Sequence, residues 1–109
     1  MIELRQYATA SGKLPFEAWL ASLKDDQAEA RIAARLNRLA GGNFGDCKPV
    51  GGGVRELRID WGPGYRVYYA MIDQACVLLL CGGDKRRQSA DIAQAIEYLN
   101  DHKQRSRKP

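Results

Sequence analysis

The chain has 109 residues, of which 45% are apolar and 28% charged, and its formal net charge is +4. This length closes one core but not two, and this composition excludes a disordered chain, so we expect one soluble domain spanning residues 1–109. No apolar run approaches the ~20 residues that a membrane-spanning helix needs. No basic segment followed by an apolar one opens the sequence, so we expect a cytoplasmic protein without a membrane partner.

The cysteines and the single histidine limit the possible metal chemistry. Cys47, Cys76 and Cys81 form no CxxC pair, and with one histidine in the chain we expect no zinc site. We also expect no cofactor. An odd number of cysteines without a framework is typical of buried thiols in a reducing compartment. The placement of charge is more informative, because residues 54–109 hold three of the four net positive charges.

The first half of the chain predicts a strand and two helices. Residues 1–7 alternate apolar and polar side chains, which favours a half-buried strand. Pro15 suits the first position of a helix, where its missing N–H costs nothing. An apolar stripe follows at helical spacing, namely Phe16, Trp19, Leu20 and Leu23. Asp25 and Asp26 are expected to cap a second helix that ends at Ala40, before two glycines.

The second predicted helix carries three arginines on one face. Arg31, Arg35 and Arg38 lie three and four residues apart. They indicate either a solvated helix surface, which is the commoner case, or a track for a nucleic-acid backbone. From the sequence we favour the solvated surface.

Residues 47–84 predict most of a sheet. Residues 47–50 suit a short edge strand, because Pro49 cannot donate to a central ladder. Residues 51–53, all glycine, are expected to form a hinge. Three β-rich runs follow, at residues 54–60, 65–72 and 76–84, and the turn residues between them favour an antiparallel meander. Val77 to Leu80 are apolar throughout, which is typical of a strand covered on both faces.

The last part of the chain predicts a third helix and a basic tail. Ser89 is a candidate cap, and a buried stripe follows at Ile92, Ala95, Ile96 and Leu99. Residues 103–109 are expected to be a flexible basic tail, either a disordered solubilising end or an auxiliary nucleic-acid contact. The predicted order is β-α-α-β-β-β-β-α, an α+β fold in which a helical hairpin and a C-terminal helix pack on an antiparallel sheet that includes the N-terminal strand.

Three motifs resemble a known family. The segments are ELRIDWGPGYRVYY at residues 56–69, LLLCGGDK at residues 78–85 and NFGD at residues 43–46. They resemble the RelE/HigB-type toxins of type II toxin–antitoxin modules, in the addiction module killer branch of the RelE/ParE superfamily. The similarity covers roughly residues 14–103. It implies a RelE-like fold and a microbial, metal-independent endoribonuclease (mRNA interferase) that cuts mRNA on the ribosome and so inhibits translation.

The resemblance also implies a partner and a set of site residues. The partner is an antitoxin, expected to be a small helical DNA-binding protein from the same operon. In this chemistry the ribose 2′-OH attacks the adjacent phosphate, so the protein must stabilise a doubly charged phosphorane. Arg66 matches the arginine that contacts the scissile phosphate, and Arg86 matches a second catalytic arginine, with Lys85 beside it. The remaining RNA-binding positions are expected at Arg55, Arg58, Arg87 and Tyr68.

The sequence does not identify the residue that transfers protons. The late tyrosine of the family has no match in residues 89–92, which are Ser-Ala-Asp-Ile. Glu56 is the candidate catalytic base, with a cross-strand ion pair to Arg66 or Arg58 as the alternative. Tyr65, Tyr68 and Tyr69 are further candidates. Tyr68 shares a strand face with Arg66 and could stack on a base, although an aromatic residue in a meander is more often part of a core. His102, near the end of the last helix, is expected on the surface.

Two functions of other classes compete with the nuclease. ParE-like toxins share this fold but inhibit DNA gyrase and cut nothing. A non-catalytic relative would use its basic groove for the antitoxin alone. Because the ParE-like branch generally lacks the basic set, Arg66 together with Lys85, Arg86 and Arg87 favours RNA.

Overall fold

The computed structural model describes residues 1–107, so Lys108 and Pro109 of the predicted tail lie outside it. Its elements are β1 (Glu3–Gln6), α1 (Pro15–Ser22), α2 (Asp26–Ala40), β2 (Cys47–Gly51), β3 (Val54–Ile59), β4 (Tyr65–Asp73), β5 (Cys76–Asp84), a 3-10 turn (Lys85–Arg87) and α3 (Gln88–Ser106). The predicted α+β class and element order are confirmed. No helix within residues 1–107 is long and apolar enough to cross a bilayer.

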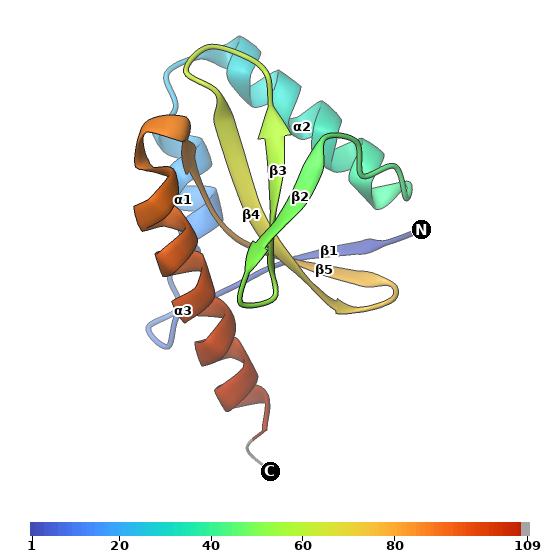
Figure 1. The fold of residues 1–109 in the computed structure, drawn as a ribbon, viewed down its shortest axis with the longest axis vertical. Coiled ribbons are helices and arrows are strands. Elements are labelled where there is room, and N and C mark those ends of the chain that lie inside the picture. The colour runs from blue at the N-terminus through green and yellow to red at the C-terminus, as the bar shows by residue number, and fades with distance from the viewer. Residues whose placement is uncertain (108–109) are drawn as a thin grey trace.

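The five strands form one sheet in the order β1-β5-β4-β3-β2 (Figure 1). The pairs β2–β3, β3–β4 and β4–β5 are antiparallel, as the meander predicted. The prediction of a wholly antiparallel sheet was wrong, because β1 pairs with β5 in parallel, from Glu3 opposite Cys76 to Gln6 opposite Leu79. A polar and apolar alternation fixes which residues share a face but not the direction of the neighbouring strand.

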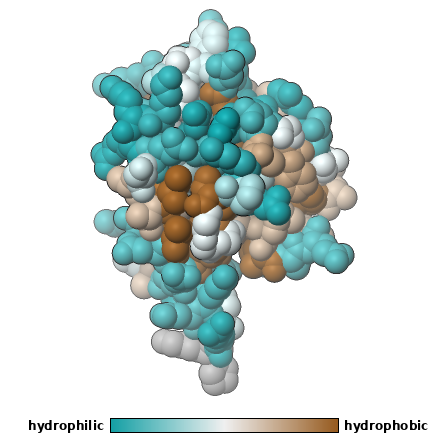
Figure 2. All heavy atoms as spheres, in the orientation of Figure 1, coloured by the Kyte–Doolittle hydropathy of each residue, from teal (hydrophilic) through white to brown (hydrophobic). Residues whose placement is uncertain are grey.

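Helices cover both faces of the sheet, so the chain has two apolar clusters. Helices α1 and α2 lie on one face and α3 lies on the other (Figure 1). Val77 and Leu79 belong to the cluster under α1 and α2, whereas Leu78 and Leu80 belong to the cluster under α3. The predicted burial of this strand on both faces is thereby confirmed. Polar side chains cover most of the face seen in Figure 2, where apolar side chains gather in small areas.

The helix ends show how well local signals predicted the structure. Asp25 caps α2, since its Oδ1 accepts hydrogen bonds from Gln27 N at 3.0 Å and Ala28 N at 3.2 Å. The prediction that Ser89 caps α3 was wrong. The chain turns earlier, where the Asp84 side chain accepts a 2.9 Å bond from Arg86 N and begins the 3-10 turn that continues into α3. The flexible tail was also predicted too long, because α3 continues to Ser106.

Two adjacent glycines of β5 let side chains approach the strand closely. A Cβ atom added at Gly82 would lie 2.2 Å from the Trp19 ring, which packs on this strand from α1. At Gly83, on the opposite face, it would lie 1.9 Å from Asp91 Oδ2 in the first turn of α3. The two glycines therefore set the distance of α1 and of the start of α3 from the sheet.

Replacing Gly82 with alanine tests this packing. We expect Gly82→Ala to lower the free energy of unfolding by about 1–3 kcal/mol, because the added methyl group must displace the Trp19 ring from a packed site. Urea unfolding followed by tryptophan fluorescence measures the change.

Gly41→Ala is the matched control, because a Cβ atom there would meet its nearest neighbour, Arg38 O, at an ordinary 3.5 Å. Equal stability of Gly82→Ala and wild type would show that Trp19 does not hold α1 at this distance.

Candidate functional site

Several of the predicted cationic residues meet at a cavity of about 260 Å³. The cavity lies where β3 and β4 approach their connecting loop. Its lining residues are Asp46, Arg58, Asp60, Gly62, Gly64, Arg66 and Lys85. They come from five segments: the loop before β2, the end of β3, the β3–β4 loop, the start of β4 and the 3-10 turn. The sheet register thus gathers residues that lie up to 39 positions apart in the sequence.

The two arginines of the cavity are direct neighbours across the sheet. Arg58 on β3 is opposite Arg66 on β4. Like charges in such a pair repel each other, so the arrangement requires a compensating group. That group is Glu56, whose Oε1 lies 3.2 Å from Arg58 Nε and 3.6 Å from Arg66 Nε. Gln88 in the first turn of α3 donates a 2.7 Å hydrogen bond from Nε2 to the other carboxylate oxygen, Oε2.

Burial decides how Glu56 can act. Its side chain is 0% exposed, whereas 35% of the Arg58 side chain and 14% of the Arg66 side chain remain exposed. A substrate hydroxyl has no access to a carboxylate that is covered on all sides. The geometry therefore corresponds to the ion-pair alternative for Glu56, with both arginines as its partners.

Lys85 and Arg66 lie side by side at Gly64. A Cβ atom at Gly64 would be 3.4 Å from both Arg66 Nη1 and Lys85 Cδ, and this glycine has a φ of +81°, which other residues rarely adopt. Gly64 therefore both makes the turn and leaves room for the two cations. Lys85 is exposed and lines the cavity.

Arg86 and Arg87 lie outside this cavity. The Arg86 side chain is 79% exposed and pairs with Asp84, with Nη2 3.1 Å from Oδ2. Hydrogen bonding from Arg86 lowers the pKa of the Asp84 carboxyl below its ordinary value. Arg87 is exposed on the same turn. The structure thus places the predicted second arginine at the surface, one residue beyond the cavity-lining Lys85.

Two predicted RNA-binding residues lie away from the cavity. Arg55 shares a sheet face with Leu57 and Ile59, which pack under α1 and α2, and it lines a different hollow beside Pro49 and Met71. Tyr68 is 0% exposed beneath α3, so no base can stack on its ring. Burial, followed by the nearby Glu56 and Asp91 carboxylates, raises the pKa of its hydroxyl.

None of the other candidates for proton transfer lines the cavity, although the Tyr65 ring lies beside Gly62, which does. Tyr69 is buried in the cluster under α1 and α2, and burial raises the pKa of its hydroxyl. Tyr65 packs edge-on against Trp19 with ring centroids 6.1 Å apart. His102 is half-buried near the end of α3. The titratable groups that line the cavity besides the arginines are Asp46, Asp60 and Lys85.

Arg35 was missed as a residue that builds the cavity. Its guanidinium donates hydrogen bonds to the backbone oxygens of Arg58, Phe44 and Asp46, the latter two at 3.3 Å. It thereby joins α2 to two cavity-lining segments. The NFGD motif at residues 43–46 marked this loop, but nothing in the sequence indicated that its carbonyl groups receive an arginine.

Residues 1–107 contain no group of three His, Cys, Asp or Glu side chains that could hold a metal ion. What the site offers chemically is a fixed pair of guanidinium groups, an amine and two carboxylates around a space that suits a phosphate and its neighbouring sugars.

The five-stranded sheet, with two helices on one face and one on the other, is consistent with a RelE-like fold. The chain belongs to the Gp49-like family of phage-derived proteins (DUF891), whose family model matches residues 18–100. This is a toxin-like addiction-module family, and membership implies an antitoxin partner. An uncharacterized protein of Haemophilus influenzae (strain ATCC 51907 / DSM 11121 / KW20 / Rd) is 55% identical over 82 residues, which make up 75% of this chain and 83% of that protein.

The ion-pair network predicts a stability effect at Glu56. Glu56→Gln should lower the free energy of unfolding by roughly 3–5 kcal/mol, because it leaves two adjacent and partly buried guanidinium groups without their counter-charge. Chemical unfolding at neutral pH measures the loss.

Asp84→Asn is the control, because it removes a carboxylate from the exposed pair with Arg86 while keeping an oxygen that can accept from Arg86 N. It should have a much smaller effect. A Glu56→Gln variant as stable as Asp84→Asn would mean that the buried carboxylate does not hold the arginines in place.

Proposed function

We propose that this protein is the toxin of a toxin–antitoxin module and acts as a metal-independent mRNA endoribonuclease. The observation that carries the proposal is the convergence of Arg58, Arg66 and Lys85 on one cavity of about 260 Å³. Membership of a toxin-like addiction-module family supports the biological role. The nuclease chemistry follows from the kinds of group that line the cavity.

The two arginines suit the charge that develops during cleavage. The 2′-oxygen of a ribose attacks the adjacent phosphorus, the bond from phosphorus to the next 5′-oxygen breaks, and a 2′,3′-cyclic phosphate and a 5′-hydroxyl result. The intermediate phosphorane carries an additional negative charge. Guanidinium groups present planar donors to phosphate oxygens. Glu56 accepts a hydrogen bond from Arg58 Nε and forms an ion pair with Arg66 Nε at 3.6 Å, so both groups are positioned before the substrate binds.

The two proton transfers fall to the remaining groups of the cavity. One of the exposed carboxylates, Asp46 or Asp60, accepts the proton of the attacking 2′-hydroxyl. The Lys85 ammonium donates a proton to the leaving 5′-oxygen. One group gains the proton that the other loses, so the enzyme as a whole carries no net proton change. Glu56 has a positioning role in this mechanism, and Arg86 has none.

The substrate and partner are inferred from the family. Messenger RNA, bound on the ribosome, is the proposed substrate. The proposed antitoxin is a small helical DNA-binding protein from the same operon that covers the cationic cavity. An interface that keeps a toxin inactive should bury at least ~1,000 Å².

A paired assay tests the proposal. Purified protein is mixed with end-labelled mRNA, either alone in the presence of EDTA or together with translating ribosomes in the Mg²⁺ buffer that ribosomes require. A parallel reaction contains gyrase, ATP, Mg²⁺ and relaxed plasmid. We expect RNA fragments that end in a 2′,3′-cyclic phosphate, and normal supercoiling. Intact RNA together with blocked supercoiling would assign the protein to the gyrase inhibitors, and no effect in either assay would leave it a non-catalytic antitoxin-binding relative.

Substitutions of Arg66 test the electrostatic role. Arg66→Ala should slow cleavage roughly 10²–10³-fold, which is the scale observed when one charge-stabilising donor is removed. Arg66→Lys should recover only part of the rate, because lysine keeps the charge but loses the planar fork. Single-turnover cleavage measures the effect.

Because Arg66 also pairs with Glu56, the thermal midpoint of each Arg66 variant must be measured alongside its cleavage rate. If activity falls only in proportion to stability across Arg66→Ala, Arg66→Lys and Glu56→Gln, Arg66 is structural and the proposed chemistry loses its main residue.

The assignment of the base is tested with Asp46→Asn and Asp60→Asn. Loss of a general base should reduce the rate roughly 10²–10⁴-fold and remove the acidic limb of the pH–rate profile. The two variants should therefore differ strongly, with one losing that limb and the other retaining it. Retention of the limb in both variants would exclude both carboxylates.

A further inference from the structure

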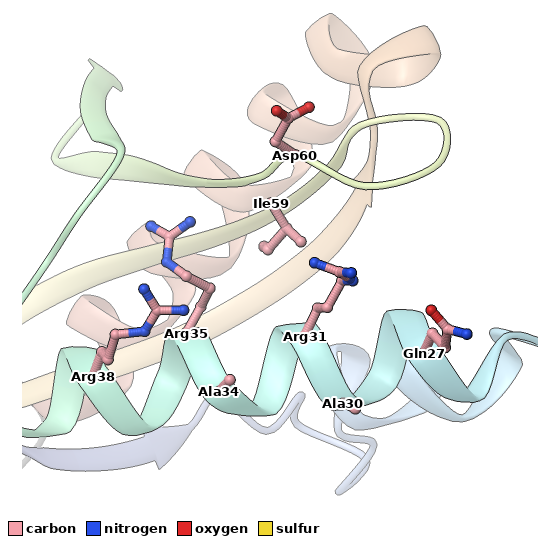
Figure 3. Close-up of a pocket in the computed structure, with 8 residues that line it drawn as sticks. All are labelled: Gln27, Ala30, Arg31, Ala34, Arg35, Arg38, Ile59 and Asp60. Carbon is pink, nitrogen blue, oxygen red and sulfur yellow. The ribbon is translucent and has the colours of Figure 1, made fainter.

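A second, larger hollow of about 460 Å³ lies between α2 and the end of β3. Arg31, Arg35 and Arg38 rise from the same side of α2 toward Ile59 and Asp60 (Figure 3). Alanines alternate with these arginines along the helix and leave the space between them open. We call this hollow the α2 groove.

The three arginines of the α2 groove do not share one role. Arg35 has a structural role, because its guanidinium donates hydrogen bonds to three backbone carbonyl groups. Arg31 lies over the Trp61 ring, with its guanidinium carbon 3.9 Å from the ring centroid, and is exposed. Arg38 is exposed, and its side chain makes no hydrogen bond or ion pair within residues 1–107. Two of the three cations are therefore open to a ligand.

The Arg31–Trp61 stack is itself held in place. Trp61 Nε1 donates a 3.1 Å hydrogen bond to Asp25 Oδ2, the same carboxyl that caps α2. This bond lowers the pKa of Asp25 below its ordinary value. Trp61 thus holds Arg31, which lines the α2 groove, from behind. Arg38, seven residues further along α2, lies roughly 10 Å away at the usual helical rise.

The α2 groove adjoins the cavity that holds Arg58 and Arg66. Asp60 lines both spaces. Arg35 lines the groove and bonds to the carbonyl groups of Arg58 and Asp46, which line the cavity. A strand that reached from the cavity into the α2 groove would pass Asp60.

We propose that the α2 groove is an extended binding site for the single-stranded RNA on one side of the cleaved bond, with Arg31 and Arg38 as phosphate contacts. This inference rests on the proposed function and describes how the RNA substrate of the proposed nuclease is bound. It departs from the expectation of a merely solvated helix surface, because the structure adds the hollow, the Arg31–Trp61 stack and a residue, Asp60, that lines both the hollow and the cavity.

The charge pattern favours RNA over an acidic protein segment. An Asp- or Glu-rich peptide would meet the Asp60 carboxylate at the junction of the two spaces and be repelled there. RNA alternates phosphates with groups that donate hydrogen bonds, and a carboxylate accepts from a ribose 2′-hydroxyl or from the amino group of cytosine. Gln27, which also lines the groove, offers both a donor and an acceptor.

The test measures how binding depends on salt. The ligands are fluorescent 2′-fluoro RNAs, which lack the attacking hydroxyl, as a dinucleotide and as a strand of about ten nucleotides within the usual range of site sizes. Fluorescence anisotropy over a series of salt concentrations gives the slope of log K against log salt. Each lost phosphate contact should reduce the magnitude of this slope by about 0.7 for a single strand.

We expect the slope for the longer RNA to fall by about 0.7 in Arg38→Gln and by about 1.4 in the double variant Arg31→Gln/Arg38→Gln. The slope for the dinucleotide should not change, because it fills only the cavity. Lys13→Gln, which removes an exposed charge before α1, is the matched control and should leave both slopes unchanged. Thermal midpoints confirm that each variant folds.

The outcomes separate this inference from the proposed function. If the wild type cuts and binds RNA but the double variant keeps the full slope, the α2 groove is not an RNA site and the nuclease stands. If the wild type neither binds nor cuts, both proposals fail. If the double variant keeps its RNA slope but loses affinity for a Glu-rich synthetic peptide that binds the wild type, the groove serves a protein partner and the RNA assignment is overturned.

Discussion

The buried carboxylate of Glu56 is the constraint on which the site depends. An ionised carboxyl group without exposure is costly unless cations and donors surround it, and here Arg58, Arg66 and Gln88 do so. These partners come from β3, from β4 and from the start of α3. A slip of the β3–β4 register would separate Glu56 from Arg66, and a different start for α3 would remove the Gln88 hydrogen bond, so this carboxylate links three elements at the edge of the cavity.

Around this centre, other contacts fix the remaining walls. Arg35 joins α2 to the loop before β2 through backbone carbonyl groups, and Gly64 leaves the space in which Arg66 and Lys85 lie together. Gly83, opposite Arg66 in the sheet, lets the first turn of α3 sit against β5. The cavity is therefore built mostly by residues that would not contact the substrate, which is typical of a preorganised site.

The sequence predicted the elements better than the positions of side chains. Periodicity predicted the helices and the meander, because burial of one face imposes a period on each element. It also placed Glu56 and Arg58 on one face of β3, and Arg66 and Tyr68 on one face of β4. It could not predict that these two faces coincide, because the register of the hairpin decides this. Nor could it predict that α3 covers Tyr68 while Arg66, two residues nearer the loop, stays partly open.

The partial neutralisation of the arginines bears on the proposed catalysis. Glu56 lies at the Nε edge of both guanidinium groups and reduces the positive potential of the cavity. The lower potential weakens the attraction for a phosphodiester with one negative charge and, more strongly, for a phosphorane with two. What the carboxylate contributes to the proposed nuclease is therefore the fixed orientation of the donors, because donors that are already in place need no reorganisation when charge develops. On this argument the acidic residue among the arginines is consistent with a nuclease.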